Sequence, residues 1–275
     1  MRQELDPRQT RGASVASSVV SRIAGGEQLR YGVVGVVGVL AVWEGISRLG
    51  LVKTVLISRP SAVVAAAIQE FSSGSIRPDI EATLLVFCIG FSIVSVLGIG
   101  IGLGGGLFPR FGWIADQWLN ASNVVPDLAI VPLLIVWFGI GITFKIVLVV
   151  LVGTFYVAIN TLTGVKSAEG RFLSVSRCYG ASRMRLVRSV ILPGSLPYIM
   201  TGLRQSAARS IIAVIVAEFV SGNQGIGFFI SLSGSFLETD RVMFGIVLLG
   251  AFSICLNEAL GFAERRFDKW RPTLQ

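Results

Sequence analysis

The sequence predicts an all-α, polytopic membrane protein with six transmembrane helices. Hydrophobic residues make up 53% of its 275 residues and charged residues only 15%. The mean hydropathy of +0.74 is far above that of a soluble domain of this length. The apolar residues form stretches long enough to cross a bilayer, and the basic residues lie between and beyond these stretches. This arrangement is typical of a membrane protein whose cations mark the cytoplasmic side.

Composition also excludes several classes of function. The chain has no histidine, and Cys88, Cys178 and Cys255 lie far apart, so a metal site, a Ser-His-Asp triad and a disulfide framework are not indicated. The glycines between Gly98 and Gly106 lack the Lys-Ser/Thr ending of a phosphate-binding loop, and close helix packing explains them better. We therefore expect a non-catalytic protein that binds no cofactor or metal, and no nucleic acid despite its net charge of +8.

The first eighty residues contain a tail, a span and a short surface helix. Residues 1–30 are polar and Arg-rich, without a compact apolar core followed by a cleavage signature, so we expect a cytoplasmic tail and no removable signal peptide. Tyr31–Gly50 is the first predicted span. The polar segment that follows contains Ser58 and Ser61, either of which suits the cap of a short helix over Ser61–Phe71 outside the bilayer.

The second and third predicted spans differ in regularity. Ala82–Pro109 is uncharged for 28 residues, enough to cross a hydrocarbon core of about 30 Å at about 1.5 Å per residue. The third span, Trp113–Phe138, contains Pro126 and Pro132 with Asp127 between them. Because proline removes a backbone hydrogen bond from a helix, we expect this span to be bent or broken.

Three further spans complete the bundle. Ile146–Val165 is the fourth, Leu196–Val220 the fifth and Val242–Gly261 the sixth, and a basic tail follows at 265–275. A Gly- and Ser-rich segment, Ser221–Arg241, separates the last two spans on the outer side. The fifth span is polar for its location and contains Arg204, Gln205, Ser206, Arg209, Ser210 and Glu218.

The distribution of lysine and arginine indicates the orientation of these spans. Segments assigned to the inside hold sixteen Lys and Arg, segments assigned to the outside hold five, and three lie in or at spans, which accounts for all 24. The positive-inside rule therefore places both termini in the cytoplasm. The transmembrane domain is expected at 31–264, between the two short tails.

The basic segment 166–194 interrupts the apolar pattern most clearly. Between Lys166 and Arg188 it carries six cations and one anion, and its apolar residues have the spacing of two short helices that meet at a corner at Gly180. Pro193 is expected to end the second of these helices. On the residues alone, an interfacial hairpin that contacts anionic lipid is as good an interpretation as a protein-docking surface.

Several short motifs resemble those of ABC importer permeases. The most specific are similar to the EAA loop of that family: Gly180-Ala181-Ser182, Leu192-Pro193, Pro197 and Gly202-Leu203-Arg204. Others resemble the binding-protein-dependent branch that handles nitrate, sulfonates, taurine and related solutes: Trp43-Glu44, Arg59-Pro60-Ser61, Thr83-Leu84, Gly90-Phe91, Pro126 to Pro132-Leu133, Trp137-Phe138-Gly139, Glu218 and Gly225-Ile226-Gly227. The resemblance covers about Leu40 to Glu264 and implies a type I ABC importer permease fold.

The resemblance also implies a function and a set of partners. The chain is expected to be the permease subunit that moves a small, anionic solute across the bacterial plasma (inner) membrane, in contact with lipid. ATP is expected on two separate ABC ATPase subunits. A second copy of the permease and an exterior solute-binding protein complete the expected assembly.

One departure concerns the contact with the ATPase. The family's Glu-Ala-Ala falls on Ser174-Val175-Ser176, so the acidic residue of the loop is missing. The coupling contact is therefore expected to rest on other groups. The residues that the resemblance implies for coupling are Ser174, Arg177, Tyr179, Gly180, Ala181, Ser182 and Arg183.

Ionisable and hydroxyl residues inside the spans are candidates for the translocation path, because burying a charge in a bilayer is costly. The candidates are Asp127, Ser206, Arg209, Ser210 and Glu218, and the positive charge of Arg209 favours an anionic solute. An equally good interpretation is that Asp127 and Arg209 pair with each other or with polar neighbours as structural contacts. Glu218 fits a gate or a binding-protein contact equally well.

Two alternative functions stay open at this point. A secondary transporter driven by an ion gradient would also use broken spans and membrane carboxylates, although no internal repeat relates residues 31–138 to residues 146–264. The same branch of permeases resembles those for pyrimidine precursors and riboflavin. A non-anionic solute such as a vitamin precursor is therefore the second alternative.

Overall fold

The computed structural model describes residues 30–50, 56–122, 127–178 and 183–267. Over these residues the regular structure is entirely helical and contains no strand, which confirms the all-α prediction. The chain divides into two compact units, residues 1–65 and 66–275. Five helices in the described part of the chain are long and apolar enough to cross a membrane: Arg30–Arg48, Arg77–Leu107, Ile142–Ala168, Met184–Ser221 and Thr239–Glu264.

In the first unit, the polar end of the Arg30–Arg48 helix organises the start of α2, Pro60–Ser73. Glu44 accepts hydrogen bonds from the backbone N–H of Ser61 at 3.1 Å, from the Ser61 hydroxyl at 2.8 Å and from Arg48 at 2.7 Å. The first N–H groups of a helix have no partner within the helix and favour a carboxylate. Of the two serines expected as the cap, Ser58 and Ser61, Ser61 therefore lies in the first turn of α2 and donates to Glu44 instead.

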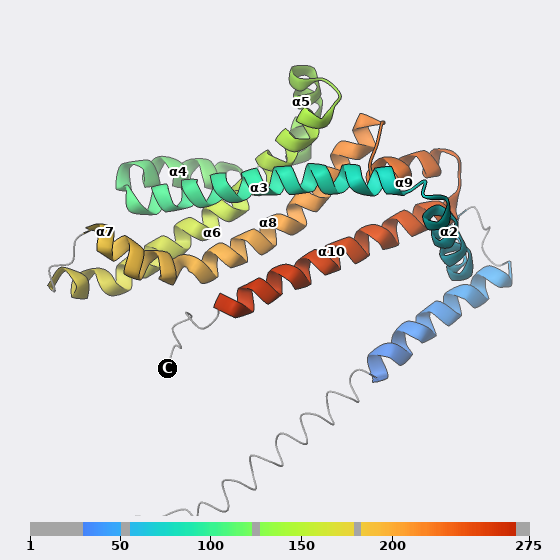
Figure 1. Cartoon of the computed structure of the whole chain (residues 1–275), viewed down its shortest axis with the longest axis horizontal. Helices are drawn as coiled ribbons and strands as arrows, with labels where there is room; N and C mark the ends of the chain where they lie inside the picture. Colours follow the sequence, from blue (N-terminus) through green and yellow to red (C-terminus); the bar gives the residue numbers. More distant parts are fainter. Residues whose placement is uncertain (1–29, 51–55, 123–126, 179–182, 268–275) are drawn as a thin grey trace, which may run out of the picture. The chain divides into compact units, whose positions relative to one another are not determined.

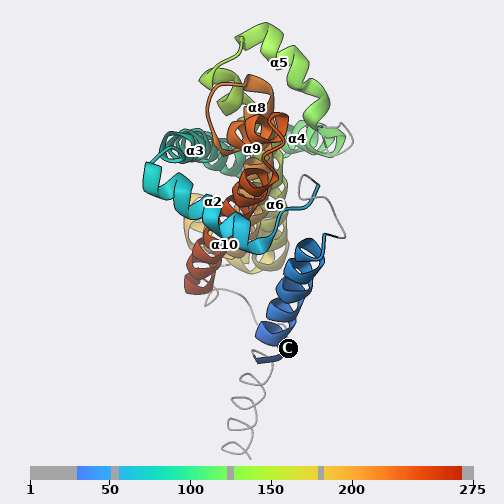
Figure 2. The same ribbon diagram turned by 90° about the vertical axis from the view of Figure 1, so that its right-hand side faces the viewer.

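The second unit is a bundle built around α6, Ile142–Cys178. α6 packs most extensively against α3, Arg77–Leu107, and α8, Leu192–Ser221, and these helices run side by side in Figure 1. α9, Ile226–Ser235, and α10, Thr239–Phe267, pack against α8. Figures 1 and 2 both place α5 and α10 on opposite sides of α6. The largest buried cluster lies between α3, α6 and α8 and includes Phe87, Val94, Phe144, Leu148, Val149, Val157, Ile211 and Val214.

Glycines allow α3 and α6 to approach closely. The pairs that meet are Gly90 with Val149, Gly98 with Val157, Gly102 with Thr161 and Gly106 with Val165. A Cβ atom would lie 2.5 Å from the Val157 Cβ if it were added to Gly98, and 2.6 Å from the Val149 Cγ1 if it were added to Gly90. A larger side chain fits only if the helices separate. The prediction that the glycines between Gly98 and Gly106 serve helix packing is confirmed for Gly98, Gly102 and Gly106, whereas Gly100 has no atom within 4 Å of an added Cβ.

The segment predicted as the third span is not one continuous helix. It consists of α4, Pro109–Ser122, a 3₁₀ turn, Asp127–Ile130, and α5, Val131–Phe138. α4 returns along α3, as Figure 1 shows, and also packs on α6. Pro132 lies in the first turn of α5, where a missing N–H is tolerated. The expected break is confirmed, but neither α4 nor α5 has the roughly 20 residues of a complete crossing.

The structure also differs from the two short helices expected in the segment 166–194. α6 continues without a break to Cys178, and from Arg183 the described chain is helical through α7, Arg183–Leu186, into α8. A π-helical stretch, Val187–Ile191, precedes Pro193, which lies in the first turn of α8 and does not end a helix. The wider π-helical turn accommodates the missing N–H of the proline.

Candidate functional site

The expected coupling residues lie where α6 ends and α7 begins. The structure describes the backbone of three of them: Ser174 and Arg177 on the last turns of α6, and Arg183 as the first residue of α7. The other four lie outside the described residues: Tyr179, Gly180, Ala181 and Ser182. Their role in coupling therefore stays a prediction.

The candidate path residues lie on different faces of the bundle. Ser206 and Ser210 are fully buried. The Ser206 hydroxyl donates to the Gly153 carbonyl oxygen of α6 at 2.9 Å, and Ser210 packs against the same glycine. Arg209 is exposed although it precedes the buried Ser210, because successive residues of a helix differ in direction by about 100°. Asp127 begins the 3₁₀ turn, and its side chain lies outside the described part.

Glu218 is a fully buried carboxylate at the end of α8. Its Oε1 accepts a hydrogen bond from the Thr83 hydroxyl at 2.8 Å, and its Oε2 accepts one from the Gly227 N–H at 2.8 Å. Thr83 in turn accepts a bond from the Ile226 N–H at 2.9 Å through its Oγ1. The carboxylate thus joins α3, α8 and α9, and its acceptors satisfy polar groups that would otherwise be buried without a partner.

The turn after α8 contains glycine because the Glu218 carboxylate lies against it. Gly225 has φ +126°, and a Cβ there would lie 2.5 Å from the Glu218 Oε2. A Cβ on Gly227 would lie 2.8 Å from the Ile215 carbonyl oxygen. The Gly225 N–H also donates to Asp79 at 2.8 Å. The Gly-Ile-Gly motif is therefore explained by the space and the backbone donors that Glu218 and Asp79 require.

Lys145 ties the start of α6 to the same turn. It is only 4% exposed, and its ammonium group donates to the Asn223 Oδ1 at 3.2 Å and to the Gln224 carbonyl oxygen at 2.8 Å. With the Glu218 contacts, these two hydrogen bonds hold α3, α6, α8 and α9 together at one end of the bundle. We call these residues, Asp79, Thr83, Lys145, Glu218, Asn223 and Gly225 to Gly227, the Glu218 junction.

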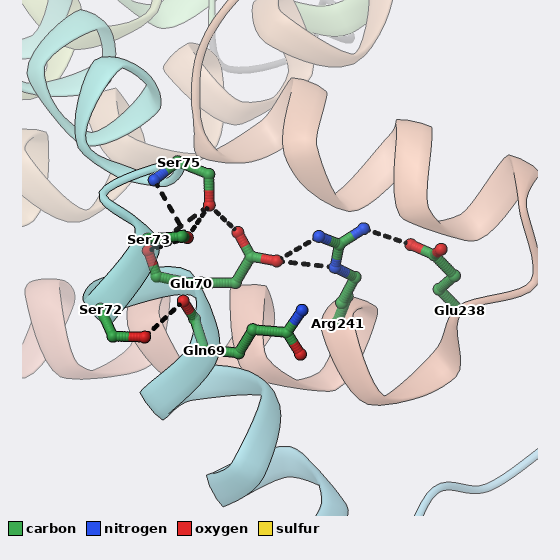
Figure 3. A network of polar contacts seen from close by, with 7 residues as sticks. All are labelled: Gln69, Glu70, Ser72, Ser73, Ser75, Glu238 and Arg241. Atoms are coloured by element: carbon green, nitrogen blue, oxygen red, sulfur yellow. Dashed lines mark hydrogen bonds and ion pairs between the residues drawn. The ribbon is translucent and has the colours of Figure 1, made fainter.

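A second polar network joins the end of α2 to the start of α10 (Figure 3). Glu70 is 2% exposed and pairs with Arg241, whose Nε lies 2.7 Å from the Glu70 Oε1. Arg241 also donates to Glu238 at 2.7 Å, and the Ser75 hydroxyl donates to Glu70. The sequence pattern did not indicate this network, because Glu70 and Arg241 are 171 residues apart.

The exposed surface of the bundle changes in character between helices. The exposed side chains along α3 and α10 are mainly apolar and include Leu84, Leu85, Ile89, Ile93, Val96, Leu97, Ile246, Val247 and Ile254. On α8, Gln205 and Arg209 are exposed, beside the half-buried Tyr156 and Asn160 of α6. The guanidinium carbon of Arg209 lies 5.2 Å from the centroid of the Tyr156 ring. The apolar faces suit lipid, whereas the face that carries Arg209 does not.

Comparison with known proteins identifies the family. Residues 95–270 match the family described as the binding-protein-dependent transport system inner membrane component. The chain belongs to this family. The permease is 32% identical to the taurine transport system permease protein TauC of Escherichia coli over 241 residues, which cover 86% of this chain and 88% of the relative. It is 35% identical to the putative aliphatic sulfonates transport permease protein SsuC of the same organism over 236 residues, 86% of this chain and 90% of the relative.

Among solved structures, the permease resembles an inward-facing conformation of the MetNI methionine ABC transporter. The TM-score is 0.58 at 19% identity, over 72% of this chain and 99% of the solved chain, so the likeness concerns the fold. Family membership makes the protein a multi-pass inner-membrane component of a binding-protein-dependent ABC importer, and a non-catalytic one. It favours the importer over the transporter driven by an ion gradient.

Proposed function

We propose that the permease moves a small anionic solute with a sulfonate-like headgroup across the inner membrane. An exterior binding protein delivers the solute, and two ABC ATPase subunits supply the energy. Two copies of the permease form the transmembrane unit, and the path runs between them, as symmetric pairing favours.

The exposed cation of Arg209 on a spanning helix carries this proposal. Arg209 lies 12 residues before the end of α8 at Ser221, a length of about 18 Å, which places it near the middle of a bilayer. No carboxylate of the described residues lies within 4 Å of it. A cation without a carboxylate partner is unfavourable in contact with lipid at that depth. The same cation would attract an anion if it lined a water-filled path. The sulfonate relatives support the same class of solute.

We place six crossings in the membrane, with both termini in the cytoplasm. α4 and α5 together supply the third crossing as a broken helix, beside the five long apolar helices. Five crossings alone would put the termini on opposite sides of the membrane. The excess of Lys and Arg in both tails and in the segment 166–194 favours the same side for all three.

The segment 166–194 transmits the movement of the ATPases to the spans. The uncharged run of α6 ends at Val165, before Lys166, and the helix continues to Cys178, so it projects about 20 Å beyond that run. Lys166 pairs with Asp116 of α4 at the base of this projection. ATP binding closes the ATPases, moves both projections and turns the paired bundles outward, with Ser174 in place of the family's acidic residue.

Affinity purification tests this proposal. A tagged permease, extracted from its native membrane in mild detergent, should bring an ABC ATPase with it at two permeases and two ATPases per complex by native mass spectrometry. A permease that purifies without an ATPase would contradict the coupling assignment. The binding protein of the same system, titrated with ethanesulfonate, nitrate and riboflavin, should bind an anion. If it binds riboflavin and neither anion, the solute assignment is refuted and the vitamin alternative is supported.

A further inference from the structure

We propose that Tyr156, Asn160, Gln205 and Arg209 form a membrane-embedded binding site for an oxyanion group of the solute. This inference rests on the proposed function and gives its path a specific site. We call the four residues the α6–α8 polar cluster. They differ from the buried serines of α8, because all four lie on the exposed or half-exposed face.

The cluster lies at one depth on two neighbouring helices. The guanidinium carbon of Arg209 lies 5.2 Å from the centroid of the Tyr156 ring, and Arg209 lies 12 residues before the end of α8 at Ser221. Tyr156 and Asn160 are one turn apart on α6, and Gln205 and Arg209 are one turn apart on α8, so each pair shares a face. The Asn160 Nδ2 donates to the Gln205 Oε1 at 3.1 Å and joins the two pairs.

The cluster offers donors and positive charge to a ligand. A guanidinium has five N–H donors and no acceptor, and the Tyr156 ring holds that of Arg209 by a cation–π contact. Gln205 accepts from Asn160 through its Oε1, and its Nε2 donors have no partner among the described residues. Such a set fits the oxygens of a sulfonate, carboxylate or nitrate group, which bind guanidinium and amide N–H groups through charge-assisted hydrogen bonds.

Three other arginines of the described helices have carboxylate partners. Arg48 pairs with Glu44, Arg204 pairs with Glu264, and Arg241 pairs with Glu238 and Glu70. A lipid headgroup is an unsuitable partner for Arg209, because Arg209 lies about 18 Å from the end of α8 at Ser221. In a symmetric pair, the second copy presents an identical cluster, so the two sites face one path.

Cysteine reactivity tests the site in the complete transporter, reconstituted in vesicles from a background without native cysteines. Gln205→Cys is reacted with an anionic reagent, sulfonatoethyl methanethiosulfonate, and with a cationic one, trimethylammonioethyl methanethiosulfonate. The ratio of the two rates should exceed that of a free thiol. In the Gln205→Cys/Arg209→Gln variant the ratio should fall roughly tenfold, because the nearby positive charge is lost. Ser92→Cys, on the apolar face of α3, is the matched control and should react with neither reagent.

Saturating ethanesulfonate should also slow the reaction of Gln205→Cys in the presence of Arg209. An unreactive Gln205→Cys, or a rate ratio that Arg209→Gln leaves unchanged, would overturn the site. ATP-driven uptake by the unmodified transporter in the same vesicles reports on the proposed function separately. Uptake without charge-selective labelling would reject the site alone, whereas charge-selective labelling without uptake would keep the site and reject the importer.

Discussion

Gly98→Ala should destabilise the bundle by about 2 kcal/mol, because it places a methyl group where α3 and α6 are in contact. The added carbon would lie 2.5 Å from the Val157 Cβ and 3.1 Å from the Thr154 carbonyl oxygen, whereas carbon atoms pack at about 3.5–4 Å. The helices must therefore separate by about 1 Å, or Val157 must leave its rotamer. Val157 is 0% exposed within the largest buried cluster, so its neighbours leave little room for that adjustment.

Gly100→Ala is the matched control, since nothing lies within 4 Å of a Cβ at that position of the same helix. Alanine favours a helix over glycine, so the control should keep or slightly raise the stability. Thermal unfolding of the purified permease in detergent, followed by circular dichroism, compares the two variants. If both unfold at the same temperature, the close glycine contact does not hold α3 to α6, and the packing argument is refuted.

Three further substitutions test the buried polar contacts and the coupling segment. Glu218→Ala should lower the free energy of unfolding by about 3 kcal/mol, because it leaves the buried Thr83 hydroxyl and the buried Gly227 N–H without an acceptor. In thermal unfolding, an effect no larger than that of the exposed control Glu81→Ala would contradict this. Arg241→Ala should also lower the free energy of unfolding by about 3 kcal/mol, because it leaves the buried Glu70 carboxylate without its cation. The control Arg77→Ala breaks an exposed pair and should hardly change the unfolding temperature. A larger effect of Arg77→Ala than of Arg241→Ala would be inconsistent with the network of Figure 3. Arg177→Glu should release the ATPase during affinity purification at an unchanged unfolding temperature, and retained ATPase would remove Arg177 from the docking surface.

The long spans could be predicted because length and hydropathy are local properties of the sequence. Pro126 and Pro132 likewise indicated the break in the third segment. Pro193 led to a wrong prediction of a helix end. A proline removes a backbone hydrogen bond from a helix, and the effect depends on the backbone before it. Here the π-helical stretch Val187–Ile191 accommodates the missing N–H. The buried Ile191, packed with Val165 and Leu186, belongs to tertiary contacts that no local pattern shows.

The candidate site could be predicted only in part. Arg209 was recognisable as a charge within an apolar stretch. Whether its side chain is exposed or buried could not be predicted, because α8 carries small and polar residues on several sides. The pair of Tyr156 and Asn160, one turn apart in an uncharged span, was an available signal, because two polar side chains on one face of a span indicate a polar surface there. The contact of Thr83 with Glu218 joins residues 135 positions apart, and such a contact has no signature in one sequence.

ATP-driven uptake by the purified transporter tests the central claim most directly. Vesicles that contain the permease and its ATPase, with ATP on the ATPase side and the loaded binding protein on the other, are treated with ionophores that collapse ion gradients. We expect uptake of radiolabelled ethanesulfonate that requires both ATP and the binding protein, persists without ion gradients and falls at least tenfold in Arg209→Gln. Uptake that stops when the gradients collapse, although ATP is still present, would contradict the account.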